Sequence, residues 1–245
     1  MKQVSENNQA LLPIYRIENP IECYIIQRIN RFVVEVQIEE KLFRASINNT
    51  GKLTQFLVKG KKAFCLSHDK PGKTDFKLFS IMDGDHAAII DTRLQMRAFE
   101  RSIEMGLIPW LRGYEKFKRN ARLGSSLIDY LVEGDGPQLY LEAKSAVMRE
   151  HRYAMYPDCP SARGRKHISE LTEHANQGGK ALLLFIAALP SVEAFKPYEV
   201  GDPELYELLQ KAHRAGVEIR SIGMSYHPQD TYIHVFAPDL SVELL

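Results

Sequence analysis

The sequence predicts an α/β protein (α+β overall) built in two parts, a small β-barrel over residues 1–90 and an α/β domain over residues 91–245. In the first part, short runs rich in valine, isoleucine and aromatic residues are separated by turn signals, which is typical of a small barrel. From residue 91 onward, segments with helical spacing of apolar residues alternate with strand-like runs. That alternation favours a mixed sheet flanked by helices.

The first part contains strand-like runs at residues 21–29, 32–38, 42–47, 54–58, 63–67, 74–82 and 86–90. Residues 48–51 form a strong turn signal, and residues 83–84 indicate a tight hairpin. An OB-like barrel fits the length of this part and its basic loops. An SH3-like barrel is the alternative, because periodicity does not distinguish the two.

The second part has helices predicted at residues 94–106, 161–177 and 203–215. Strands are predicted at residues 115–119, around Asp129, around Glu142, and at residues 181–187 and 217–222. The run 181–187 is continuously apolar, as expected for a strand covered on both faces. Residues 181–222 therefore predict a strand–helix–strand unit with a right-handed crossover.

Composition gives only broad limits on the class of protein. The net charge is +1, hydrophobic residues make up 44% of the chain, and the longest apolar run, 181–189, is too short to span a bilayer. Residues 1–8 lack the apolar core of a signal peptide. The three cysteines, Cys23, Cys65 and Cys159, are scattered and not in metal-binding spacing, so they are expected to be reduced thiols. We therefore expect a cytoplasmic protein without a membrane partner.

Basic residues are clustered although the total charge is nearly balanced. One cluster holds Lys59, Lys61 and Lys62, a second lies between Arg112 and Arg122, and a third holds Arg163, Arg165, Lys166 and His167. Clustered lysine and arginine can follow the phosphates of a nucleic acid even when acids elsewhere cancel the sum. The alternative is that each cluster is a solvated face.

Asp129, Glu142 and Lys144 form the most informative pattern in the chain. Alternate side chains of a strand share a face, so Glu142 and Lys144 point the same way. A hairpin through residues 133–137 can place Asp129 beside them. Two carboxylates with one ammonium make a hard-oxygen site for Mg²⁺ or Mn²⁺, with Lys144 placed to orient water or stabilise developing charge. The alternative is a cross-strand ion pair at a strand edge.

The order helix–strand–strand–strand–helix–strand, with Asp129 on one strand and the pattern Glu-X-Lys on the next, resembles the core of the PD-(D/E)xK nucleases, which cut nucleic-acid phosphodiesters. Further motifs, in order along the chain, resemble those of the sugar fermentation stimulation protein A (SfsA) family. They lie at residues 49–51, 90–92, 142–145, 156–167 and 212–219. The resemblance covers roughly residues 22–222.

This resemblance implies an N-terminal OB-like domain and a C-terminal PD-(D/E)xK-like domain. It implies DNA as the partner, because the bacterial namesake of the family is regarded as a DNA-binding protein that influences sugar-utilisation genes. Nuclease activity is inferred for the family from its fold. Two functions therefore remain in competition, metal-dependent cleavage of DNA and DNA binding without turnover. A metal-dependent enzyme acting on a small phosphorylated metabolite is a weaker third, because the basic clusters spread beyond one phosphate.

In this pattern Asp129 and Glu142 are expected to bind the divalent ion, with the carbonyl of Ala143 completing the inner shell. Lys144 is expected to position the attacking water or stabilise the transition state. Glu115, on the preceding strand, is a further candidate ligand. An ion pair between Glu115 and a neighbouring basic residue is the alternative.

Nucleic-acid contacts are expected from Arg163, Lys166 and His167 at the start of a helix, where backbone N–H groups and the helix dipole favour phosphate. The alternative is a basic first turn that pairs with a nearby carboxylate. In the barrel, Asn49 and Thr50 are expected to meet a phosphate through their backbone amides, or to form a structural turn only.

One position departs from the SfsA pattern. Leu127 stands where the family usually has arginine before the first carboxylate, which removes one guanidinium from the site. Arg119 and Arg122 are the candidates to replace that contact. A homodimer is plausible on chemical grounds, because two sites are the simplest way to cut both strands of a duplex. The sequence does not determine the strandedness of the DNA.

Overall fold

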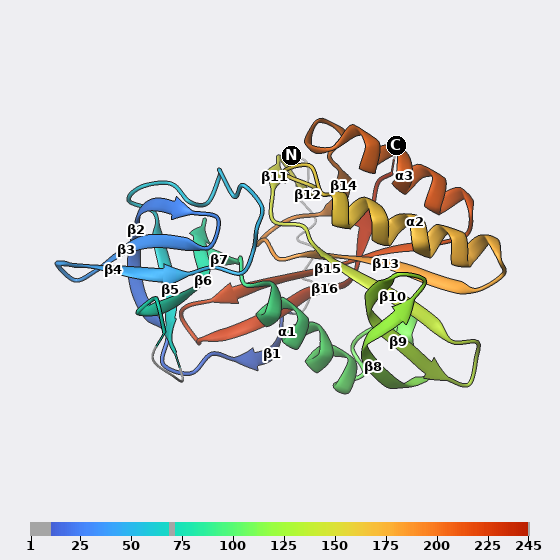
Figure 1. The fold of residues 1–245 in the computed structure, drawn as a ribbon. Helices are drawn as coiled ribbons and strands as arrows, with labels where there is room; N and C mark the ends of the chain where they lie inside the picture. The colour runs from blue at the N-terminus through green and yellow to red at the C-terminus, as the bar shows by residue number, and fades with distance from the viewer. Residues whose placement is uncertain (1–10, 69–71, 245) are drawn as a thin grey trace, which may run out of the picture.

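The computed structural model describes residues 11–68 and 72–244, with a β-barrel on one side and an α/β region on the other (Figure 1). The N-terminal segment 1–8, for which no signal-peptide core is predicted, lies outside the described residues. No helix within the described ranges has the length and apolarity that a membrane span requires.

Cys23, Cys65 and Cys159 are free thiols, although the Sγ atoms of Cys23 and Cys65 lie only 3.5 Å apart in the barrel core.

Five strands close the barrel: β2 (Ile21–Asn30), β3 (Val33–Ile38), β4 (Lys41–Ser46), β5 (Lys62–Ser67) and β6 (Phe76–Asp83). β2 pairs antiparallel with β3 and β5, and β3 pairs antiparallel with β4. A parallel β4–β6 pair and an antiparallel β5–β6 pair complete the ring. Closure gives every strand of the ring two partners, so the barrel does not present a free edge for aggregation.

The prediction of a strand at residues 54–58 is wrong. The segment forms a turn, in which the N–H groups of Phe56 and Leu57 donate to the carbonyl of Leu53. Phe56 is buried in the core, so the apolar character of this segment reflects an anchored turn rather than a strand. The tight hairpin predicted at residues 83–84 is present, because Asp83 pairs with His86 at the start of β7 (His86–Ile89).

The α/β region begins with α1 (Thr92–Glu104) and the short 3₁₀-helix η1 (Pro109–Leu111). Its strands are β8 (Tyr114–Leu123), β9 (Ser126–Gly134), β10 (Leu139–Ser145), β11 (Arg149–Glu150), β12 (Tyr153–Tyr156), β13 (Lys180–Ala187), β14 (Ala194–Pro197), β15 (Glu218–His227) and β16 (Tyr232–Val242). Its other helices are α2 (Ala162–Asn176), η2 (Glu199–Gly201) and α3 (Pro203–Arg214). The predicted mixed sheet is present, because β10, β13 and β15 pair in parallel whereas β8–β9–β10 and β15–β16 pair antiparallel.

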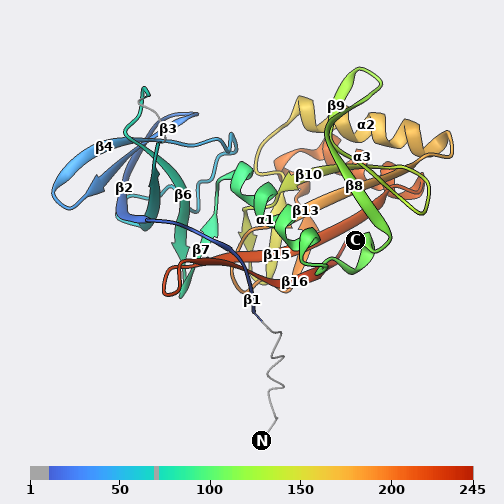
Figure 2. The ribbon, with the colours of Figure 1, turned by 90° about the horizontal axis from the view of Figure 1, so that it is seen from below.

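Each long helix begins at a side chain that accepts backbone N–H groups, which satisfies donors that have no partner within the helix. Asp91 caps α1, Ser161 caps α2 and Asp202 caps α3. Helices α2 and α3 lie side by side above the sheet in Figure 1, and α1 lies on the other side of it, nearer the viewer in Figure 2. The predicted strand–helix–strand unit is formed by β13, α3 and β15, with β14 and η2 inserted before the helix.

The barrel and the α/β sheet share a seam. Strand β7 pairs with β15 through Ala87 and Tyr226. Strand β1 (Leu12–Arg16), which lies in the range predicted for the barrel, pairs with β16 instead. The long β15–β16 hairpin therefore runs from the α/β region to the barrel (Figures 1 and 2).

Candidate metal and phosphodiester site

The two candidate carboxylates meet where β9 and β10 stop pairing. The backbone ladder ends at the pair Leu141 and Tyr130, which are the chain neighbours of Glu142 and Asp129. Beyond that pair, side chains replace the ladder. The N–H of Asp129 donates to Oε2 of Glu142 at 3.1 Å, and the N–H of Ala143 donates to Oδ2 of Asp129 at 2.9 Å. The structure thus brings Asp129 and Glu142 together at a fork between two strands.

Glu142 lies between two basic side chains. Glu142 is only 2% exposed, and Nζ of Lys144 donates to its Oε1 at 2.6 Å. Nδ1 of His167, from α2, lies 2.5 Å from the same oxygen. Because β10 pairs with β13 in the interior of the sheet, Glu142 and Lys144 point the same way from a buried strand. The structure therefore brings together the predicted triplet of Asp129, Glu142 and Lys144, and His167 joins it.

The environment moves the pKa values of the two carboxyl groups in opposite directions. Burial, and then the negative charge of Glu142, raises the pKa of Asp129 to about 6. Burial would also raise the pKa of Glu142, but Lys144 and His167 outweigh it and lower that pKa to about 2. The pKa of Lys144 is raised because the charge of Glu142 outweighs its burial. At neutral pH the site holds two carboxylates, of which Asp129 lacks a cationic partner.

These residues fit a divalent cation. Oδ1 of Asp129 has no hydrogen-bond partner among the described residues, and burial together with the charge of Glu142 raises the pKa of Asp129. A cation with hard-oxygen preference would relieve the repulsion between Asp129 and Glu142. Two carboxylates and the neighbouring backbone of Ala143 supply the oxygen ligands that Mg²⁺ and Mn²⁺ favour.

The fork opens into a cavity of about 280 Å³. Its lining includes Asp129, Glu142 and Lys144 together with residues of α1 and the start of α2. A second cavity of about 410 Å³ adjoins it, between the barrel loop that follows β4 and the segment that precedes α2. The two cavities share Thr50, Ser145, Ser161 and Arg163, so they form one continuous groove between the barrel and the α/β region.

The start of α2 places its basic residues on different sides of the helix. Arg163 is exposed and lines both parts of the groove. Lys166 is exposed as well, but it is not part of either lining. Arg165 binds Asp202 with Nη1 at 2.8 and 3.0 Å and so ties α2 to α3. His167, predicted as a phosphate contact, is buried against Glu142 and acts within the carboxylate cluster instead.

The barrel loop reaches the groove. Oδ1 of Asn49 accepts the N–H of Gly51 at 3.0 Å, so Asn49 shapes a turn, and its Nδ2 lies 3.4 Å from the hydroxyl of Ser145. Asp158 accepts the N–H of Leu53 at 2.9 Å and so fastens the loop to the α/β region. The structure therefore places Asn49 and Thr50 at the rim of the site, and their contact with phosphate stays a prediction.

Three other predicted residues do not join the cluster. Strand β8 carries Glu115 opposite the far end of β9, where Lys116 pairs with Glu133. Because Asp129 lies opposite the part of β8 near Asn120, Glu115 is about 16 Å along the strand from the fork. The structure therefore does not place Glu115 near enough to share the metal.

Arg119 and Arg122, the candidates to replace the guanidinium missing at Leu127, do not line the groove. Arg119 pairs through Nε and Nη2 with the carboxylate of Glu100 on α1. Arg122 lies opposite Leu127 in the β8–β9 ladder, away from the groove linings. The basic cluster between Arg112 and Arg122 is thus partly neutralised and partly solvated.

Sequence reasoning missed two polar residues of the site. Gln95, buried on α1, donates from Nε2 to the hydroxyl of Ser145 at 2.9 Å and to the carbonyl of Ile89 at 2.7 Å. Gln95 and Ser145 both line the cavity at the fork. A helical face that also holds Leu94 and Ala98 gives no sign of a functional glutamine. A signal did exist for His167, because it falls on the buried face of α2 between Gly164 and Leu171.

Comparison with known proteins agrees with this geometry. A model of the sugar fermentation stimulation protein RE domain matches residues 93–230, and a model of the SfsA N-terminal OB domain matches residues 26–90. The chain belongs to the SfsA family. The OB match confirms the OB-like barrel over the SH3-like alternative, and the predicted fold class is confirmed.

Relatives and a solved structure extend the match over nearly the whole chain. A sugar fermentation stimulation protein homolog of Pyrococcus furiosus is 46% identical over 91% of this chain and 95% of its own length. A homolog of Archaeoglobus fulgidus is 43% identical over 94% of this chain and 99% of its own length. The structure of Pyrococcus furiosus SfsA in complex with Ca²⁺ aligns with a TM-score of 0.90 and 44% identity, covering 95% of this chain and 99% of that one.

Proposed function

We propose that this SfsA protein is a DNA-binding, divalent-metal-dependent phosphodiesterase whose site is the fork between β9 and β10. The observation that carries the proposal is the pair of adjacent carboxylates, half-buried Asp129 and buried Glu142, beside the ammonium of Lys144. Binding of DNA alone gains nothing from carboxylates that face phosphate. The Ca²⁺ in the related Pyrococcus furiosus structure supports a divalent cation, and Mg²⁺ or Mn²⁺ is the ion we propose for catalysis.

The side chains have separable roles in this mechanism. Asp129 and Glu142 would hold the ion with the carbonyl of Ala143; when bound, Mg²⁺ or Mn²⁺ polarises the scissile phosphate and lowers the pKa of a bound water. Lys144 lies 2.6 Å from Glu142 and within the cavity lining, where its ammonium can orient the attacking water or stabilise charge on the phosphate. His167 holds the carboxylate of Glu142 in place from α2.

The groove is the proposed path for DNA. Arg163 at the start of α2 and the backbone of Thr50 in the barrel loop stand on the two sides of its shared part. Both can contact phosphate oxygens, which fix the position of a nucleic acid without reading its sequence. Affinity should therefore fall with rising salt and depend weakly on base sequence. A homodimer stays a prediction, which light scattering of the purified chain tests.

The test is incubation of the purified chain with labelled single-stranded, double-stranded and branched DNA, with Mn²⁺, Mg²⁺ or a chelator. We expect cleavage that requires the metal and is abolished by Glu142→Ala and by Lys144→Ala, while salt-sensitive binding is retained. If the chain neither binds nor cuts any of these substrates, the proposal is wrong, and small phosphorylated ligands become the substrates to examine.

One observation favours the second candidate, DNA binding without turnover. Both oxygens of Glu142 are already engaged, Oε1 by Lys144 and His167 and Oε2 by the N–H of Asp129. A metal must displace or share these contacts. Salt-sensitive binding without cleavage under any metal condition would identify this second function.

A further inference from the structure

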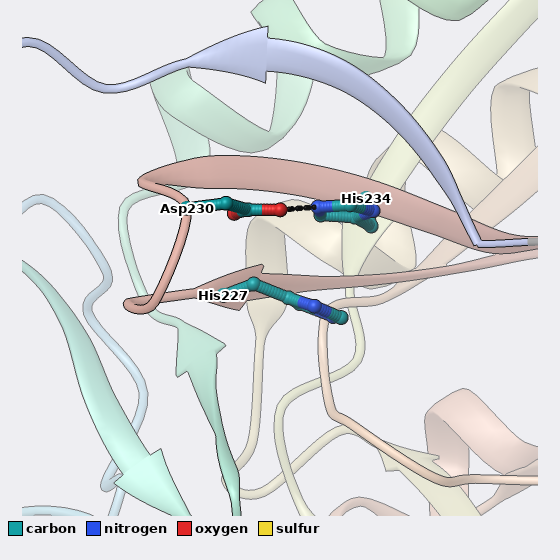
Figure 3. Close-up of side chains that lie close together, drawn as sticks. All are labelled: His227, Asp230 and His234. Carbon is teal, nitrogen blue, oxygen red and sulfur yellow. Dashed lines mark hydrogen bonds and ion pairs between the residues drawn. The ribbon is translucent and has the colours of Figure 1, made fainter.

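A group of titratable side chains lies apart from the fork, at the end of the β15–β16 hairpin. His227 ends β15, His234 lies on β16, and Asp230 is in the turn between them (Figure 3). In the antiparallel register His234 lies opposite Ser225, so His227 and His234 share one face of the hairpin. One possible ligand atom from each of His227, Asp230 and His234 lies within 4.8 Å of the other two.

The three imidazole rings of this region are stacked. His86 of β7 stacks on His227 with ring centres 3.6 Å apart, and His227 stacks on His234 at 4.0 Å. Nε2 of His234 pairs with Oδ2 of Asp230 at 2.7 Å. The Nδ1 atoms of His86 and His234 are buried without a hydrogen-bond partner in the described structure. Buried polar atoms normally have partners, so the cluster has unused capacity to bind.

The two histidines of this cluster and its carboxylate differ in exposure to solvent. His227 and His234 are 6% and 7% exposed, whereas the side chain of Asp230 is 47% exposed. The core therefore holds the imidazoles of His227 and His234 in place, whereas the carboxylate of Asp230 is accessible to solvent.

We propose that His227, Asp230 and His234 form a second metal site, for Zn²⁺ or a similar transition metal. Two imidazoles and one carboxylate are the ligand types and number of many zinc sites that keep one position for water. This set is softer than the all-oxygen fork and favours Zn²⁺, Co²⁺ or Ni²⁺ over Mg²⁺. Zinc–ligand bonds of about 2.0–2.1 Å place ligand atoms roughly 3.3 Å apart, so a small rotation of side chains completes the site.

The location gives this site a structural consequence. His86 belongs to β7, the strand that joins the barrel to β15, and Nε2 of Gln229 in the hairpin turn donates to the carbonyl of Asp85 at 3.2 Å. Strand β1 covers the other side through the pairing of Pro13 with His234. A metal held by the hairpin would therefore stabilise the seam between the barrel and the α/β sheet.

The experiment is a calorimetric Zn²⁺ titration of the full-length, chelator-treated chain at neutral pH, with excess Mg²⁺ present to occupy the fork. We expect one Zn²⁺ per chain, with affinity at least about 10-fold weaker in His234→Gln and in Asp230→Asn. We expect Asp230→Asn to fold normally, because this side chain is exposed and the asparagine still offers an oxygen to the N–H of Tyr232. Circular dichroism would confirm that both variants are folded.

Two further variants locate the binding. His213→Gln removes an exposed histidine on α3 and should leave Zn²⁺ affinity unchanged, as should Glu142→Gln at the fork. The inference is overturned if the wild-type chain does not bind Zn²⁺. It is equally overturned if Zn²⁺ binding survives in folded His234→Gln and Asp230→Asn but is lost in Glu142→Gln, which would assign the metal to the fork.

Discussion

Two neighbouring carboxyl groups, those of Asp129 and Glu142, have opposite environments at the fork. Glu142 has two basic side chains, Lys144 and His167, on one oxygen, whereas the only hydrogen bond to the carboxylate of Asp129 among the described residues comes from the N–H of Ala143. The ionised form is thus stabilised at Glu142 and disfavoured at Asp129. That combination costs stability in the metal-free protein and is relieved when a cation binds, which is typical of a functional site.

Asp129→Asn should therefore stabilise the metal-free protein at neutral pH. The pKa of Asp129 is about 6 in the folded chain and 3.8 as its ordinary value, so the folded state holds its proton more tightly. Wild-type stability falls as the pH rises from about 4 through 6 and then levels off, whereas the amide does not titrate. Above pH 6 the variant should be more stable by about 3 kcal/mol, with the difference disappearing below pH 4.

Urea unfolding of both chains with a chelator, at pH 4 and at pH 8, measures this difference. Equal stability gaps at the two pH values would contradict the environment derived for Asp129. Adding Mn²⁺ at pH 8 should then stabilise the wild-type chain more than Asp129→Asn, because the variant has lost a ligand.

At the residue scale, the sequence predicts those neighbours in the site whose positions follow from the geometry of a strand and a short hairpin. Glu142 and Lys144 share a face because they are two residues apart on a strand, and a short hairpin places Asp129 beside them. The role of His167 depends on how α2 packs on the sheet, and the distance of Glu115 depends on the β8–β9 register. Local spacing determines neither of these, so the sequence predicts a phosphate contact for His167 and a metal-ligand role for Glu115 that the structure does not bear out.

Among the elements, the barrel loop has the most direct link to the site. Arg28 donates to the carbonyls of Gly51 and Lys52 at 2.7 Å each, while Asp158 holds the N–H of Leu53 from the other side. The loop is thus fixed from the barrel and from the α/β region together. Its approach is close, because a Cβ on Gly51 would lie 2.7 Å from both carboxylate oxygens of Asp158.

Gly51→Ala should displace this loop from the groove. The added methyl group collides with Asp158, whose carboxylate is held by Leu53, so we expect a cost of about 1–3 kcal/mol in stability and weaker DNA binding. Gly136→Ala is the matched control, since a Cβ there meets nothing within 4 Å. Thermal unfolding and DNA titration of both variants test this, and identical behaviour of the two would show that the loop contact is unimportant.

Elements with a clear period were predicted well, whereas anchored irregular segments were not. Helices α1, α2 and α3 begin at capping residues that the sequence displays, and their apolar faces are buried as expected. Residues 54–58 have the composition of a strand, but a single buried aromatic, Phe56, accounts for it. The pairing of β1 with β16 joins the two ends of the described chain and has no local signal.

On the scale of the whole molecule, the barrel and the α/β region are connected by shared strands and by Arg149. Its guanidinium donates to Asp83 at the end of β6, with Nη2 at 2.7 Å, and to the carbonyl of Pro190 at 2.5 Å. Backbone and side-chain bonds with Gln55 add a second link to the barrel. The groove depends on this connection, because its two walls come from different regions.

The chain should therefore unfold in a single cooperative transition. Arg149→Met removes the donors of Asp83 and Pro190 while keeping a side chain of similar reach, and should lower stability by about 2 kcal/mol. Differential scanning calorimetry measures both effects. Two separate transitions in the wild-type chain would show that the barrel and the α/β region fold independently.

The measurement that tests the central claim most directly is the single-turnover rate of DNA cleavage in Mn²⁺ with enzyme in excess, which separates chemistry from binding. Glu142→Gln keeps the shape of the fork but removes a charge, so the account predicts DNA binding within about 3-fold of wild type and cleavage slower by at least about 100-fold. Glu115→Gln, an exposed acid at the far end of β8, should cleave at the wild-type rate. A Glu142→Gln enzyme that cuts DNA as fast as the wild type would contradict the assignment of the fork as the catalytic site.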